Sequence, residues 1–172
     1  MNSSAGIVLW IDGYNDIFSD FDPRPYAART VSDDFIAQVK KASHEFPHRP
    51  GTFKLLVPEK ARSAEDESVI RERLRSFFDQ TFSRLSASIA VTRKKGIILA
   101  SAGFIVLLGA SYLKDMQSAK FAITFLVTLF EPAGWFLLWA GFDHFTTISK
   151  EKRSELLFYK RMEGVGIEFG SY

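Results

Sequence analysis

The residue whose type and setting could do chemistry most directly is Glu131, near the middle of the apolar run FAITFLVTLFEPAGWFLLWAGF at 121–142. About 20 apolar residues in a helix are long enough to cross the hydrocarbon layer of a bilayer. An ionised carboxylate at that depth costs about a few kcal/mol, so such acids face protein or water and often serve function. Glu131 therefore predicts either a contact between helices or part of an ion pathway.

Polar residues share one face of this predicted helix with the glutamate. At about 100° per residue, they fall within a stripe about 80° wide that comprises Gln117, Lys120, Thr124, Thr128 and Glu131. The same face continues inward with three bulky apolar residues that could form a hydrophobic gate, namely Trp135, Leu138 and Phe142. Because the stripe stops halfway, the pattern favours a structural contact of Glu131 with Ser101, Thr128 or a neighbouring subunit over ion conduction.

A second group of acids lies near the N-terminus. The segment DGYNDIFSDFDPR contains four carboxylates that could hold a divalent cation, Asp12, Asp16, Asp20 and Asp22. Their spacing matches no EF-hand, and the favoured interpretation is that Asp20 and Asp22 cap turns or pair with Arg24 and Arg29. The three histidines are not spaced as metal ligands, and neither a phosphate-binding loop nor a nucleophile motif is visible, so we expect no enzyme and no cofactor.

A second apolar run, GIILASAGFIVLLGASYL at 96–113, precedes the first and is separated from it by only seven residues. So short a link predicts a helical hairpin. Small residues that permit close helix approach recur along the first helix at Gly96, Ala100, Gly103 and Ala110, and Pro132 is expected to kink the second. Two spans bury little surface, so a mid-membrane acid favours a homo-oligomer.

Basic residues flank the outer ends of this pair of runs and would meet lipid headgroups. They are Arg93, Lys94, Lys95, Lys150, Lys152 and Arg153. The positive-inside rule then places both termini in the cytoplasm, with the protein integral to the inner or plasma membrane. The net charge of +2 gives no indication of nucleic-acid binding.

The remaining residues predict a small soluble domain. The short run IVLWI at 7–11 and FKLLV at 53–57 are typical of buried strands, with a helix at about 33–45 between them. Ser63 and Asp66 form a capping-box pattern for a helix that runs to the membrane, with Arg71, Arg73 and Arg75 on its solvent side. For 155–171 we favour a helix followed by a strand; the alternative is a β-hairpin that turns at Gly164.

These elements predict an α+β membrane protein, a two-helix transmembrane hairpin inserted in a small cytosolic βαβα(αβ) domain. The cytosolic domain would comprise 1–95 with 144–172 and the hairpin 96–143, with spans at 96–113 and 121–142. We expect a non-catalytic homo-oligomer that displays a sensing or scaffolding domain, with membrane lipids, its own copies and a cytosolic protein as partners. The alternative is an oligomeric ion or proton channel lined by Glu131; a third possibility is a metal-dependent membrane-bound enzyme.

Overall fold

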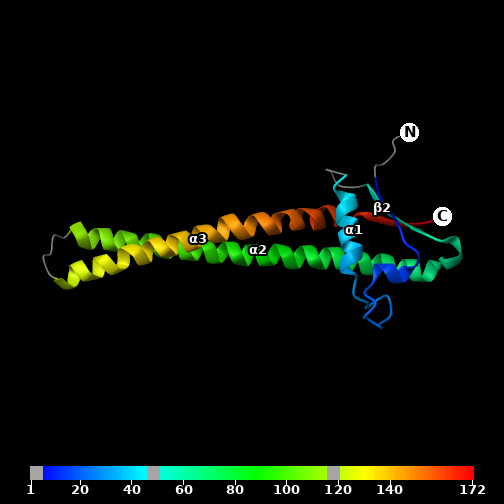
Figure 1. The fold of residues 1–172 in the computed structure, drawn as a ribbon, viewed down its shortest axis with the longest axis horizontal. Helices are drawn as coiled ribbons and strands as arrows, with labels where there is room; N and C mark the ends of the chain where they lie inside the picture. The colour runs from blue at the N-terminus through cyan, green and yellow to red at the C-terminus, as the bar shows by residue number, and fades with distance from the viewer. Residues whose placement is uncertain (1–5, 46–50, 116–120) are drawn as a thin grey trace. The chain divides into compact units, whose positions relative to one another are not determined.

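The computed structural model describes residues 6–45, 51–115 and 121–172, with the side chains of 146–151 also outside the description. It combines short strands with two long helices, α2 and α3, which Figure 1 shows in green and in yellow to orange. In chain order the elements are β1 (Ile7–Trp10), the 3-10 helix η1 (Tyr14–Ile17), α1 (Asp33–Ser43), β2 (Thr52–Val57), the 3-10 helix η2 (Glu59–Ala61), α2 (Ala64–Asp115), α3 (Phe121–Met162) and β3 (Gly166–Ser171).

The three strands form one parallel sheet in the order β1-β2-β3. Ile7 pairs with Phe53, and Phe53 pairs in turn with Ile167. The chain leaves the sheet after Val57 and returns to it at Gly166. In the sequence, both long helices therefore come between β2 and β3, which are neighbours in the sheet. The predicted strands at 7–11 and 53–57 and the last strand are thereby confirmed. The β-hairpin alternative for 155–171 is wrong, because α3 remains helical to Met162 and β3 pairs with β2.

One face of the sheet forms the core of this part of the chain. Along β2, Phe53, Leu55 and Val57 are fully buried, whereas the residues between them are only half-buried. Three helices contribute the apolar side chains that are buried with this face, chiefly Phe35, Ile36 and Val39 from α1, Ile70, Leu74 and Phe78 from α2, and Phe158, Tyr159 and Met162 from α3. On the other face, Val8 and Trp10 of β1 stay exposed. The sheet is therefore packed on one side only.

The helix starts agree with the sequence in position and differ in detail. Ser63 caps α2 as predicted, since its Oγ accepts a hydrogen bond from the backbone N–H of Asp66 at 3.3 Å. Ser32 occupies the N-cap of α1, but its side chain makes no capping hydrogen bond there. The first turn of α1 instead carries the favourable negative charge of Asp33 and Asp34.

The prediction that Arg71 and Arg73 lie on the solvent side of α2 is wrong. The Nε of Arg71 donates to the carbonyl of Ile167 at 3.0 Å, and its guanidinium lies 5.8 Å from the ring centre of Phe169. The Nε of Arg73 donates to the carbonyl of Arg29 at 3.0 Å. Arg71 and Arg73 are both half-buried. This is possible because long basic side chains can cover apolar surface with their methylene groups while their nitrogens bind carbonyl oxygens.

The chain divides into two compact units, 1–84 with 155–172 and 85–154, which we call the α/β unit and the helical unit. The divisions fall inside α2 and inside α3. Helix α2 is continuous from Ala64 to Asp115, so the helix predicted to begin at Ser63 extends through the apolar run at 96–113. The boundaries expected at 95 and 144 stay a prediction.

Candidate functional site

Both long helices contain a segment that could cross a membrane. Within the described residues, α2 and 121–145 of α3 are long and apolar enough, judged by length and composition. Only 17% and 11% of the residues in their most apolar windows are buried in the structure. The core helices of water-soluble proteins bury such residues. The exposure is therefore what lipid-facing segments require.

Within the helical unit, α2 and α3 approach each other closely at glycines. A Cβ added to Gly103 would lie 2.7 Å from the carbonyl oxygen of Gly134 and 2.7 Å from the backbone nitrogen of Leu138. A Cβ on Gly141 would lie 2.7 Å from the backbone nitrogen of Ala100. Real side chains do not reach such distances, so these positions require glycine.

The small-residue seam expected on α2 faces this contact. Gly96 is buried, and a Cβ there would lie 3.0 Å from the Cβ of His144; Ala110 is 1% exposed. Sequence reasoning missed the matching glycines of α3, Gly134 and Gly141, although their seven-residue spacing was a visible signal. Pro132 lies inside α3 with an exposed side chain, so it does not take part in this contact.

Glu131 forms an ion pair with Lys114 of α2. The Nζ of Lys114 lies 3.3 Å from Oε1 of Glu131, and the two side chains are 71% and 45% exposed. The sequence suggested Ser101 or Thr128 as the partner of Glu131, but the structure shows Lys114 instead. The hydroxyl of Thr128 donates to the carbonyl of Thr124 at 2.9 Å. The pair thus lies at the surface of the helical unit. Of the predicted polar stripe, Gln117 and Lys120 lie outside the described residues.

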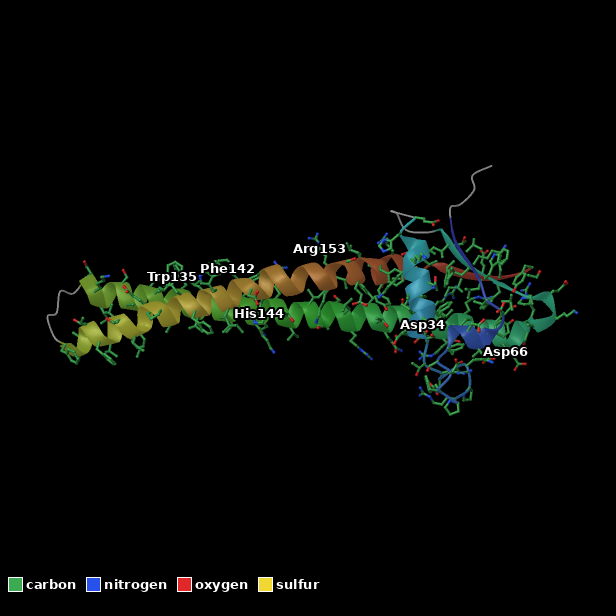
Figure 2. The ribbon with its side chains drawn as sticks, viewed as in Figure 1. Asp34, Asp66, Trp135, Phe142, His144 and Arg153 are labelled. Atoms are coloured by element: carbon green, nitrogen blue, oxygen red, sulfur yellow. The ribbon has the colours of Figure 1, made fainter. Side chains whose placement is uncertain are left out.

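The three residues predicted as a hydrophobic gate do not share one environment. Trp135 and Phe142 are 57% and 55% exposed along α3 (Figure 2). Leu138 is half-buried, and its backbone lies against Gly103 in the contact with α2. The structure therefore brings Leu138 to the helix contact and leaves Trp135 on the outside.

The basic residues expected at lipid headgroups are mostly exposed. Arg93, Lys94, Lys95 and Arg153 are exposed, whereas the side chain of Lys150 lies outside the description. Lys152 is half-buried, and its Nζ donates to the hydroxyl of Ser88 at 3.1 Å. At the same end of α3, the Nδ1 of His144 is buried without a hydrogen-bond partner in the described part of the chain.

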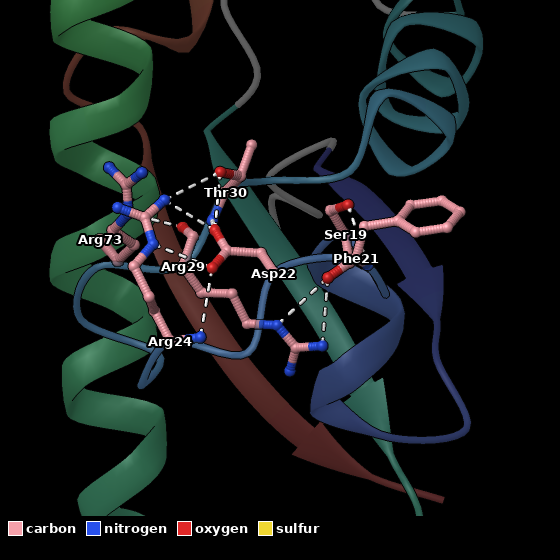
Figure 3. A network of polar contacts seen from close by, with 7 residues as sticks. All are labelled: Ser19, Phe21, Asp22, Arg24, Arg29, Thr30 and Arg73. Carbon is pink, nitrogen blue, oxygen red and sulfur yellow. Dashed lines mark hydrogen bonds and ion pairs between the residues drawn. The ribbon is translucent and has the colours of Figure 1, made fainter.

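The acidic loop of the α/β unit is held together by hydrogen bonds within the protein (Figure 3). Arg24 binds Asp22 through two nitrogens, at 2.9 and 2.7 Å, and Thr30 donates to the same carboxylate from its backbone and its hydroxyl. The bond from Arg24 holds the pKa of Asp22 far below its usual range. Arg29 instead donates to the carbonyl of Ser19.

The remaining acids of this loop do not complete a metal site. Oδ2 of Asp16 accepts the backbone N–H groups of Asp12 and Gly13 at 2.8 and 3.1 Å. Asp12 and Asp20 are exposed. Within the described residues, no three Asp, Glu or His side chains come close enough together to hold a metal ion. The loop is thus arranged as an internally bonded turn rather than a cation cage.

A buried polar cluster that the sequence did not reveal fixes the start of α2. Glu67 is 6% exposed; it accepts hydrogen bonds from the Tyr14 hydroxyl at 3.0 Å and from two nitrogens of Arg62 at 2.8 and 3.0 Å. The oxygen of Tyr14 also accepts the backbone N–H of Ser63 at 3.0 Å. Arg62 lowers the pKa of Glu67, and burial raises the pKa of Tyr14. The cluster thus links η1, the residue before α2 and the first turn of α2 through side-chain hydrogen bonds.

No protein-family model, curated protein or solved structure matches this chain.

Proposed function

We propose that this protein is a two-span membrane protein that forms a homo-oligomer and presents its α/β unit in the cytoplasm as a non-catalytic binding module. The apolar segments of α2 and α3 form the transmembrane hairpin, and their glycine contact holds it together. The basic residues that flank it, Arg93, Lys94, Lys95 and Arg153, are exposed for anionic headgroups. The positive-inside rule supports a cytoplasmic location for the α/β unit.

The single observation that carries the homo-oligomer is the exposed ion pair of Glu131 and Lys114. Charged groups that face hydrocarbon are costly, and they normally face another protein surface or water. Glu131 keeps 45% of its side chain exposed after its contact with Lys114. A second copy of the helical unit, placed on the side of α3 that carries Glu131, would cover the pair.

Cysteine cross-linking in membranes tests this arrangement directly, because the chain has no cysteine of its own. On a helix, Thr128 lies about 60° from Glu131 and Leu129 about 160° from it, at the same depth. Both positions are exposed in the helical unit. We expect Thr128→Cys to form disulfide-linked dimers under mild oxidation and Leu129→Cys to form few.

Oligomeric state in lipid nanodiscs provides the complementary measurement. Wild type should give more than one copy per particle by light scattering at sub-micromolar protein, and Glu131→Leu should change that number because it removes the anion of the pair. A strictly monomeric wild type, or equal cross-linking at positions 128 and 129, would contradict the proposal.

An ion or proton channel is the second candidate, favoured by the exposed stretch of Thr124, Thr128 and Glu131 on α3. Copies that meet along this stretch would enclose oxygen atoms that can replace ion hydration. Flux into liposomes decides between the two functions. Glu131→Gln should abolish flux if the protein conducts, whereas a binding module should show no flux in wild type.

A further inference from the structure

A cavity of about 430 Å³ opens in the α/β unit between the carboxyl end of β1 and the first turns of α1. Its lining includes Trp10 and Asp12 from the end of β1, Asp34 and Gln38 from α1, and Tyr172 after β3. In sheets with parallel strands, ligands bind preferentially beyond the carboxyl ends of the strands. The cavity has this location, and it takes no part in the structural clusters around Asp22 and Glu67.

The aromatic wall of the cavity is unusual because it stays in water. The rings of Trp10 and Tyr172 stack with their centres 5.2 Å apart and an angle of 16° between their planes. Trp10 is 71% exposed and Tyr172 51% exposed, so the stack adds little to the core. The backbone N–H of Tyr172 donates to the carbonyl of Val57 at 3.3 Å, which holds this wall beside the sheet. An exposed indole face attracts cations.

The charges around the cavity are all of one sign. The described residues that line it include three acids, Asp12, Asp16 and Asp34, and no Lys, Arg or His. Asp16 is oriented by the backbone N–H groups of Asp12 and Gly13, which accounts for one of its oxygens. Asp12 and Asp34 are exposed at the rim. Figure 2 labels Asp34 on α1.

We infer that this cavity, the Trp10 pocket, binds a guanidinium or alkylammonium group, stacked on Trp10 and paired with Asp12 and Asp34. A planar guanidinium suits both halves of the site, since it stacks on aromatic faces and forms paired hydrogen bonds with carboxylates. The inference rests on the proposed role of the α/β unit as a binding module and gives that module a ligand class. The group can belong to a free small cation or to an Arg or Lys side chain of a protein partner.

Fluorine NMR of the full chain in nanodiscs, labelled with 5-fluorotryptophan, tests the pocket. The chain has three tryptophans, so Trp10 gives one signal and Trp135 and Trp139 of the helical unit serve as internal references. The probes are arginine amide, a capped Gly-Arg-Gly peptide, and the same peptide with neutral citrulline in place of arginine. We expect a saturable shift of the Trp10 signal with both arginine compounds and none with citrulline.

Two aspartates of the same helix turn provide the matched variants. Asp34 lines the pocket, whereas Asp33 does not, and both are exposed, so neither change disturbs the core. Asp34→Asn should weaken arginine binding about two- to fivefold, the range of an exposed ion pair, and Asp33→Asn should leave it unchanged. Trp10→Leu should weaken binding about two- to thirtyfold. Because this variant lacks the Trp10 signal, its binding is measured from the backbone NMR signals of Asp12 and Gly13.

The outcomes separate the ligand sources and the two proposals. Tighter binding of the peptide than of arginine amide assigns the pocket to a protein partner, and equal binding assigns it to a free cation. An unchanged Trp10 signal, an equal shift with citrulline, or equal effects of Asp33→Asn and Asp34→Asn would overturn the inference. None of these results alters cross-linking at Thr128, so failure of the pocket and failure of the membrane assembly remain distinguishable.

Discussion

The contact of α2 with α3 at Gly103 makes a sharp prediction about stability. A Cβ at this position would lie 2.7 Å from two backbone atoms of α3, where ordinary contact begins at 3.4 Å. Backbone atoms cannot rotate away as a flexible side chain can. Gly103→Ala therefore requires α2 and α3 to separate by about 0.7 Å, which weakens dispersion contacts along the whole interface.

The size of the effect follows from overpacking, which typically costs about 1–3 kcal/mol. Between membrane helices this packing is a principal source of association, because lipid tails are as apolar as the side chains. Alanine also stabilises a helix relative to glycine by up to about 1 kcal/mol, and that gain partly masks the clash. The variant therefore needs a control that shares the gain and lacks the clash.

Gly109 supplies that control. It lies in the same helix, and a Cβ there would meet nothing within 4 Å. Gly109→Ala should leave stability unchanged or raise it slightly. The difference between the two variants isolates the clash, and we expect Gly103→Ala to be the less stable by about 1–3 kcal/mol.

Unfolding in mixed micelles by titration with SDS measures this difference, with the fluorescence of Trp135 and Trp139 in α3 as the signal. Spin labels on the two helices would report the expected separation independently. Equal unfolding midpoints for Gly103→Ala and Gly109→Ala would refute the close contact of the two helices.

Three further predictions concern the α/β unit. Glu67→Gln should lower the free energy of unfolding by about 1.5–3 kcal/mol, because the charge-assisted hydrogen bonds from Arg62 to the buried carboxylate are lost. Urea titration should show a change of less than about 0.5 kcal/mol for the control Glu65→Gln, an exposed position in the same turn. The folded state lowers the pKa of Glu67 below its ordinary value of 4.5, so the contribution of Glu67 to stability should be complete above pH 4.5 and fade as the pH falls below it. In a plot of melting temperature against pH, the fall on the acid side should be shallower for Glu67→Gln than for wild type, and an equal fall would contradict this linkage. Burial raises the pKa of Tyr159 from 10.0 to about 12, so stability should be fully retained below pH 10 and decline by about 2 kcal/mol as the pH rises to 12; Tyr159→Phe should remove most of that decline in the same measurement.

Local patterns in the sequence were sufficient to predict most of the elements. The β-branched run at 7–11 and the capping pattern at Ser63 depend on near neighbours, and both elements form where expected. A last strand was also predicted, since Val165, Ile167 and Phe169 alternate with small or polar residues, and β3 forms there beside β2. The same local reasoning misplaced Arg71 and Arg73, because helix periodicity alone does not say which carbonyl groups approach a long side chain.

The sequence by itself determined that two segments are apolar enough to cross a membrane and that an acid interrupts one of them, since hydropathy and length are sums over neighbouring residues. Only the tertiary structure decided that Lys114 is the partner of Glu131, that Gly134 and Gly141 complete the seam of α2, and that Trp10 stacks on Tyr172. Each of these contacts joins residues from different elements. Their distances depend on how helices and strands pack in three dimensions, and a linear pattern does not contain that information.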